Sequence, residues 1–147
     1  MSSSIEIENV LRHNKTFKGC YAHDNLPTIT KFPCSLIINT DNHDRPGDHW
    51  VGLVLNKKKC FYFDSYGAPV LSTHILLFLC DKYKEIVFST KQVQSIYSDK
   101  CGHFAIAFIT SVHSIKSYEK FIHIFHSNNL IDNDNISNNI VNCIKNN

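Results

Sequence analysis

The sequence predicts an α+β fold in which helices pack on a small mixed, partly antiparallel sheet. Short apolar runs such as residues 34–40 suit strands, and polar turns separate them. Longer stretches with an apolar side are typical of helices. The two kinds follow one another without an internal repeat or a linker, which favours the α+β class. At 147 residues, 43% of them hydrophobic, the chain is expected to form one domain, 1–147, with a real core.

The elements can be assigned in chain order. Ser4 can cap a first short helix, and residues 17–33 are expected to be irregular because glycine and proline interrupt them. Strands are expected at 34–40, 49–55, 60–64, 86–88 and 93–96, with a polar loop at 41–48 and a hairpin turn at 56–59. Helices are expected at 70–83, 101–113 and 117–125, and in the Asn-rich tail, where Ile136, Ile140 and Ile144 form an apolar stripe.

Composition excludes several classes of protein. The formal net charge of +2 is too small to indicate a nucleic-acid-binding protein by itself, and no window reaches the roughly 18 apolar residues of a membrane span. The first residues lack the features of a signal peptide, so the protein is expected to be intracellular and not secreted. The cysteines occur singly, which argues against a disulfide framework; they are Cys20, Cys34, Cys60, Cys80, Cys101 and Cys143.

The stretch 92–109 carries the strongest chemical signal. Cys101 falls where an apolar helix should begin, and the positive end of a helix dipole favours a thiolate. Gly102 has no side chain, so a substrate backbone could approach the sulfur. The alternative is a buried core cysteine that leads an apolar helix. Zinc is not expected, because Cys20 with His23 and Cys101 with His103 lack a matching second pair.

A nucleophilic cysteine needs a base, a group that orients the base and donors for the oxyanion. His49 and Asp64 stand at the outer ends of the two arms of the expected hairpin, so antiparallel pairing puts them at one end of the sheet. Gln94 precedes Cys101 by seven residues, and its amide could complete an oxyanion hole with the Cys101 backbone N–H. Each also has an ordinary interpretation: a surface histidine, a turn aspartate and a solvent-facing glutamine.

Three motifs together resemble the adenovirus-type cysteine endopeptidases, or adenains, which are relatives of the ubiquitin-like-protein proteases. They are Gly47-Asp-His-Trp-Val-Gly, Cys60-Phe-Tyr-Phe-Asp-Ser-Tyr-Gly and Gln94-Ser-Ile-Tyr-Ser-Asp-Lys-Cys-Gly-His-Phe. The family order of His, Asp or Glu, Gln and Cys-Gly falls here on His49, Asp64, Gln94 and Cys101-Gly102. The resemblance covers roughly residues 17–113. It implies an adenain-like fold, with His49 as base, Asp64 as its orienter and Gln94 in the oxyanion hole.

The resemblance also implies a biological role. It predicts cleavage of viral capsid or core precursor proteins beside glycine, with Trp50 over the cleft and Gly102 beneath it. The enzyme would act as a monomer in the cytoplasm or nucleus of an infected cell and in the virion, without a membrane. The chemistry requires no cofactor. Adenovirus enzymes are activated by DNA and by a disulfide-linked peptide, but the aligned position here is Tyr83, with Cys80 nearby, and the basic surface for DNA is thin.

Other functions remain open from the sequence. The residues Phe63-Asp-Ser resemble the deconjugases of ubiquitin-like modifiers as much as the viral branch. Some bacterial acyltransferases share the same order of triad residues. A non-catalytic interaction module would be the expectation if the triad were broken, and here every position is filled.

Overall fold

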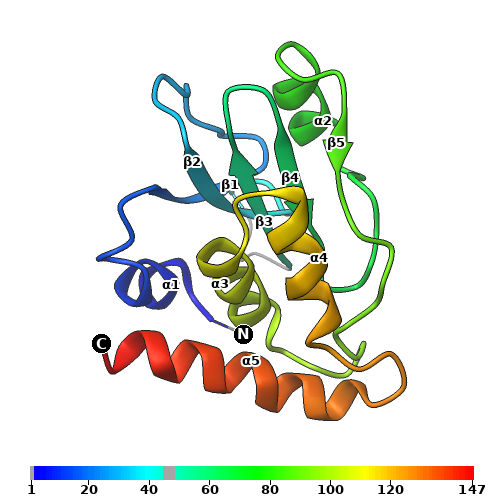
Figure 1. Ribbon diagram of the computed structural model, residues 1–147. Coiled ribbons are helices and arrows are strands. Elements are labelled where there is room, and N and C mark those ends of the chain that lie inside the picture. Colours follow the sequence, from blue (N-terminus) through cyan, green and yellow to red (C-terminus); the bar gives the residue numbers. More distant parts are fainter. Residues whose placement is uncertain (1, 45–48) are drawn as a thin grey trace.

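The computed structural model describes residues 2–44 and 49–147, and over these it is a small α+β protein with a mixed open sheet (Figure 1). The strands are β1 (Phe17–Ala22), β2 (Cys34–Asn39), β3 (Trp50–Leu55), β4 (Cys60–Phe63) and β5 (Ile86–Val87). The helices are α1 (Ser4–Val10), α2 (Thr73–Cys80), α3 (Cys101–Ser111), α4 (Ile115–His123) and α5 (Leu130–Lys145).

The sheet follows the chain order from β1 to β5. The two outer pairs, β1 with β2 and β4 with β5, are parallel, whereas the central strand β3 pairs antiparallel with both β2 and β4. The β3–β4 hairpin turns at Asn56, whose N–H donates to the carbonyl of Lys59 over 2.8 Å. This arrangement confirms the predicted α+β class, the partly antiparallel sheet and the hairpin.

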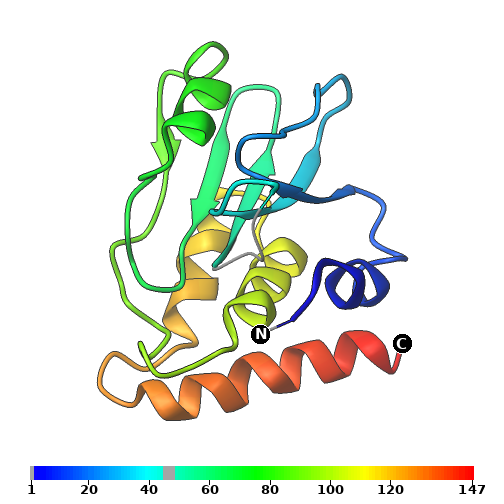
Figure 2. The ribbon, with the colours of Figure 1, turned by 180° about the vertical axis from the view of Figure 1, so that it is seen from behind.

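Apolar side chains cover both faces of the sheet. On one face, α1, α3, α4 and α5 enclose an aromatic cluster that includes Phe63, Phe104, Phe108 and Phe121 (Figures 1 and 2). On the other face, α2 packs against Leu36, Ile38, Leu53 and Tyr62. Helix α3 lies directly over β3, and a β-carbon at Gly52 would collide with the ring of Phe108. This close approach fixes the position of α3, and therefore of Cys101, relative to the sheet.

Side-chain caps explain where several helices begin. The hydroxyls of Ser3, Ser72 and Ser114 and the amide of Asn129 accept hydrogen bonds from backbone N–H groups in the first turns of α1, α2, α4 and α5. The cap of α1 is therefore Ser3, one residue before the predicted Ser4. The predicted tail helix is confirmed, because Ile136, Ile140 and Ile144 pack against the core from α5.

Two predicted segments differ in the structure. Residues 17–33 are not irregular throughout, because Phe17–Ala22 forms β1. Gly19, interpreted as a strand breaker, occupies a register shift next to Phe17 with a φ of 151°, a conformation that favours glycine. Residues 93–96 are not a strand, because the N–H groups of Val93 and Gln94 both donate to the carbonyl of Ser65 instead of to a neighbouring strand.

The remaining differences concern boundaries. Strand β3 begins one residue after His49, β4 ends one residue before Asp64, and α2 is shorter than predicted because Ser72 caps it. The helices predicted at 101–113 and 117–125 span Cys101–Ser111 and Ile115–His123, and the strand predicted at 86–88 spans Ile86–Val87. Within the predicted loop 41–48, residues 45–48 lie outside the described residues.

Two further features concern membrane spans and disulfides. Over the described residues, no helix combines the length and apolar character needed to cross a membrane. All six cysteines are free thiols.

Candidate active site

His49 and Asp64 meet at the end of the β3–β4 hairpin, as the sequence predicts. The Nε2 atom of His49 lies 2.9 Å from Oδ1 of Asp64, and both side chains are largely buried. The backbone of His49 is held as well, because its carbonyl accepts the N–H of Thr40 over 2.9 Å. Pairing with the end of β2 therefore continues past the first residue of β3 and fixes the backbone of His49 at the end of the central strand.

The orientation of Asp64 is set by the turn that follows β4. Its Oδ1 also accepts the backbone N–H of Tyr66 over 2.8 Å, and its carbonyl accepts the N–H of Gly67 over 2.8 Å. Gly67 has a φ of 77°, and a β-carbon there would lie 2.7 Å from the carbonyl oxygen of Thr90. The ring of Tyr66 stacks on the imidazole of His49, with ring centroids 4.7 Å apart. The turn thus holds the carboxylate and covers the base.

The electrostatics of His49 involve Cys101 as well as Asp64. Burial alone would lower the pKa of His49, but the hydrogen bond to Asp64 and the proximity of the Asp64 and Cys101 side chains outweigh burial and raise the pKa to about 9. The Nδ1 atom is buried, and no described group stands in hydrogen-bond geometry to it. Because Nε2 faces Asp64, Nδ1 is the nitrogen free to serve the thiol. Such contacts often tighten only when a substrate is bound.

Cys101 is the first residue of α3, as predicted, and only 3% of it is exposed. The residue at the cap position is Lys100, and among the described residues no side chain caps the helix. The positive end of the helix dipole therefore acts beside the sulfur. The structure agrees with the interpretation as a core cysteine, because Cys101 is buried at the start of an apolar helix. It also agrees with the interpretation as a nucleophile, because Cys101 lies beside the His49–Asp64 pair.

Gln94 lies in a hydrogen-bond network and is fully buried. Its Oε1 accepts the hydroxyl of Ser65 over 2.5 Å, and its Nε2 donates to the carbonyl of Ser98 over 3.0 Å. Ser65 follows Asp64 and Ser98 precedes Cys101 by three residues, so Gln94 connects the two parts of the site. Gln92 is exposed, and its side chain donates to the carbonyl of Gln94. The two glutamines do not share a strand face.

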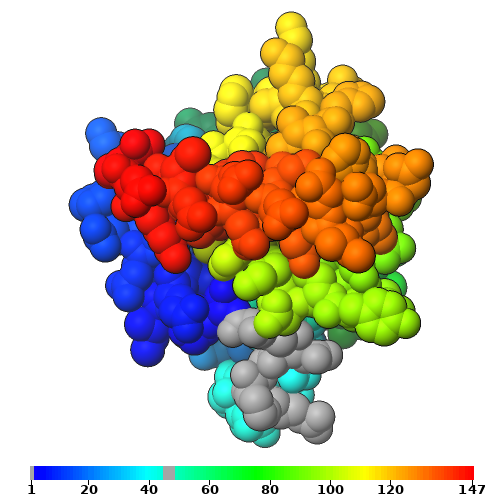
Figure 3. All heavy atoms as spheres, turned by 90° about the horizontal axis from the view of Figure 1, so that it is seen from below, coloured from blue at the N-terminus to red at the C-terminus, as the bar shows by residue number. Residues whose placement is uncertain are grey.

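Helix α5 supports this network through residues that the sequence prediction missed. Asn133 is fully buried; its Nδ2 donates to the carbonyls of Val93 and His126, and its Oδ1 accepts the N–H of His126. Asp134 accepts the hydroxyl of Ser98 over 2.9 Å. Figure 3 shows α5 lying across the molecule beside the segment that leads into α3. The only local signal was the position of Asn133 beside an apolar stripe.

Trp50 and Gly102 both contact the N-terminal segment. The Nε1 of Trp50 donates to the carbonyl of Ser2 over 2.9 Å. A β-carbon on Gly102 would lie 3.0 Å from the Cβ of Ser2 and 3.3 Å from Cδ1 of Ile7. Trp50 itself is buried. Ser2 therefore contacts both of the residues that the sequence predicts to border the substrate.

The other candidate ligands have different partners. His23 contacts Ser72 and Asn42 through its two ring nitrogens, and Nδ1 of His103 contacts Asn138. Within residues 2–44 and 49–147, no group of three or more His, Cys, Asp or Glu side chains could hold a metal ion. Tyr83 is buried and donates its hydroxyl to the carbonyl of Asn56, whereas Cys80 is exposed on α2.

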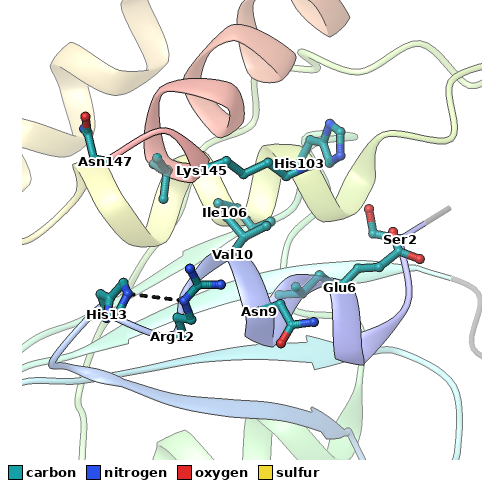
Figure 4. Close-up of a pocket in the computed structure, with 12 residues that line it drawn as sticks. Ser2, Glu6, Asn9, Val10, Arg12, His13, His103, Ile106, Lys145 and Asn147 are labelled. Atoms are coloured by element: carbon teal, nitrogen blue, oxygen red, sulfur yellow. Dashed lines mark hydrogen bonds between the residues drawn. The ribbon is translucent and has the colours of Figure 1, made fainter.

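A cavity of about 400 Å³ lies between α1, α3 and the end of α5, away from the His49–Asp64 pair (Figure 4). Arg12, His103 and Lys145 contribute basic groups to its lining, and Glu6 an acidic one. Ser2 and Ile7, which lie against Gly102, also line this cavity, but its lining does not include His49, Asp64, Gln94 or Cys101, so its position does not mark the chemistry.

Comparison with known proteins adds no assignment to this geometry. No family model matches the chain, and no curated protein matches it.

Proposed function

We propose that this protein is a cysteine endopeptidase of the adenain type. One observation carries the proposal. A buried histidine just before the central strand contacts an aspartate through Nε2, and a cysteine at a helix start lies close enough to raise the pKa of the histidine. A histidine with a raised pKa beside a cysteine favours a thiolate–imidazolium pair. A buried group whose pKa is strongly shifted by specific charge partners is typical of functional sites.

In the proposed mechanism, Cys101 Sγ attacks the scissile carbonyl and forms a tetrahedral intermediate. The oxyanion receives hydrogen bonds from the Cys101 backbone N–H and from Gln94, whose Nε2 exchanges its longer contact, 3.4 Å to the Ser98 hydroxyl, for one to the oxyanion. His49 donates its Nδ1 proton to the leaving amine, which breaks the C–N bond and leaves an acyl-enzyme. A water molecule then attacks the thioester carbonyl, His49 accepts its proton, and the thiolate departs.

The substrate class rests on the resemblance to adenains. The proposed substrates are viral capsid or core precursors, which would be cut beside glycine in extended, accessible segments. Ser2 contacts both the Trp50 indole and the position beside Gly102, so a small residue fits between these two borders. This supports the preference for a small residue, because a glycine backbone can approach the sulfur closely. An activator is not part of the proposal, since the aligned position carries Tyr83, which is buried.

The proposal is tested with a peptide library and the purified protein. Products are sequenced by mass spectrometry after incubation with wild type, with Cys101→Ala and with Cys60→Ala as a control for a buried thiol elsewhere. Wild type and Cys60→Ala should release products cut beside glycine, and Cys101→Ala should release none while keeping its circular dichroism spectrum. Equal cleavage by all three proteins, or none by wild type, would contradict the proposal.

The same assay separates the alternatives. A deconjugase would leave linear peptides intact and cut only a folded ubiquitin-like fusion at its terminal glycine. An acyltransferase would transfer an acyl group from a thioester donor to lysine without cutting a backbone bond. The deconjugase alternative is supported by the residues Phe63-Asp-Ser, which resemble that branch.

A further inference from the structure

The N-terminal segment lies where the proposed cleft should receive a substrate. Ser2 touches both borders of that gap, through its carbonyl on the Trp50 indole and through its Cβ near Gly102. The indole N–H donates to a backbone carbonyl, which is the kind of group an extended peptide substrate would offer. No pattern in the sequence links Ser2 to Trp50 or to Gly102, which are distant from it along the chain.

Helix α1 delivers this segment to the gap. Ile7 is fully buried and lies against the same face of Gly102 as Ser2. Ser3 caps α1, and its carbonyl accepts the N–H of Ile7 over 3.1 Å. Because the helix is anchored next to the gap, the effective concentration of residue 2 at the gap is high.

The segment reaches the gap from the surface of the molecule. Ser3 is exposed, Ser2 is half-buried, and the described hydrogen bond of the segment to the gap is the one from Trp50. Ser2 also lines the cavity between α1, α3 and α5, where Figure 4 shows it at the end near His103. Release of Ser2 would join the gap to that cavity while Ile7 keeps α1 docked.

We propose that residues 2 and 3 are an intramolecular ligand of the catalytic cleft, which must leave the gap between Trp50 and Gly102 before a peptide substrate enters. This inference rests on the proposed function, since it takes the gap to be the substrate path. The closed form also explains why Cys101 is only 3% exposed. A substrate that binds only the open form shows an affinity reduced by the open fraction. Because Ser2 brings a β-carbon into the gap, the accepted residues should include serine and alanine besides glycine.

The test displaces the segment with Ser2→Lys and uses Ser2→Ala as the matched control. A lysine side chain must extend past the Cβ position of residue 2, which is already closely packed against Gly102, and its charge is repelled by the positive end of α3, whereas alanine keeps both the Cβ and the carbonyl. Cys80 and Cys143 are changed to serine in every protein, because their exposed thiols would compete for iodoacetamide. Trp50 is the one tryptophan of the chain, so its indole N–H gives a single NMR signal whose solvent exchange reports the contact.

In Ser2→Lys, the indole should exchange faster, Cys101 should be alkylated faster, and the KM for a cleaved peptide should fall, the last two by about five-fold or more, with kcat little changed. Ser2→Ala should match wild type. Faster indole exchange without a change in alkylation or KM would overturn the inference. If Ser2→Lys leaves the indole protected, the variant that lacks residues 2 and 3 makes the same comparison.

The experiment distinguishes failure of this inference from failure of the proposed function. If no variant cleaves any peptide but alkylation of Cys101 still depends on residue 2, the endopeptidase proposal fails and the occupied gap stands. If peptides are cleaved by Cys101 with the same KM in all variants, the endopeptidase proposal stands and the intramolecular ligand is refuted.

Discussion

The Nε2 atom of His49 lies 2.9 Å from the carboxylate of Asp64, so Nδ1 is the ring nitrogen left for Cys101, whose side chain raises the pKa of the imidazole. This contact assigns a different partner to each of the two ring nitrogens. A carboxylate on Nε2 fixes the tautomer and stabilises the imidazolium, and in the proposed mechanism Nδ1 exchanges a proton with the thiol or the leaving amine.

The first prediction concerns the pH dependence of activity. With the pKa of His49 raised to about 9, kcat/KM should fall as the pH rises above about 9, because the imidazolium that protonates the leaving amine is lost. Asp64→Asn removes one cause of the raised pKa, so this alkaline limb should move to lower pH. Asp81→Asn, at an exposed position on the far side of α2, should leave it unchanged. A limb that stays in place in Asp64→Asn would show that another group controls it.

The same shift predicts how stability depends on pH. The folded pKa of His49 lies above its ordinary value of 6.5, so the stabilisation by protonated His49 is fully present below about pH 6.5 and is lost as the pH rises through about 9. Urea unfolding from pH 6 to 10 should show a decline in the free energy of unfolding that is smaller in Asp64→Asn. Equal slopes in the two proteins would contradict this.

The second prediction compares the two glutamines. Gln94→Ala should reduce kcat by about 10² to 10³, the usual loss for an oxyanion donor. Gln92→Ala should stay near wild type, because the Gln92 side chain is exposed and reaches only a backbone carbonyl. The reverse pattern in steady-state kinetics would transfer the oxyanion role to Gln92.

The third prediction concerns the support from α5. Asn133→Ala leaves the carbonyls of Val93 and His126 without their buried donor and should lower the free energy of unfolding by about 1–3 kcal/mol. Asn135→Ala, on the exposed side of the same helix, should change it by less than about 0.5 kcal/mol. Denaturant titration measures both, and equal effects would exclude a special role for Asn133.

The fourth prediction concerns specificity. Trp50→Ala removes the indole from one border of the gap, so the preference for small residues at the cleavage site should relax. The peptide library should then show cuts between larger residues that wild type does not make. Efficient cleavage by wild type between bulky residues, with no small residue within two positions of the bond, would contradict a narrow gap.

Local patterns were enough to predict the centre of the site. The hairpin between His49 and Asp64 has a short polar turn at Asn56, so pairing rules alone put its ends together. The apolar periodicity after Cys101 predicted the start of α3. In both cases the signal lies within a few residues of the functional side chain.

The parts that the sequence did not predict depend on contacts between distant residues. Residues 93–96 were assigned to a strand, but the backbone donors of Val93 and Gln94 go to Ser65, which no local pattern reveals. Asn133 could not be told from its neighbours in an Asn-rich tail, although it alone among them reaches Val93 from a fully buried position. The contact of Ser2 with Trp50 is likewise a product of the packing of α1.

The most direct test of the central claim is the rate at which iodoacetamide alkylates Cys101 at pH 7, mapped by mass spectrometry in the Cys80→Ser, Cys143→Ser background. Burial, aided by nearby charge, raises the pKa of Cys20 to about 12 and of Cys60 to about 11, so these thiols should react slowly. The His49→Gln variant lacks the imidazolium that stabilises a Cys101 thiolate, and its rate at Cys101 should fall by about ten-fold or more. The same rate in wild type and His49→Gln would contradict the account, because Cys101 would then not be activated by His49.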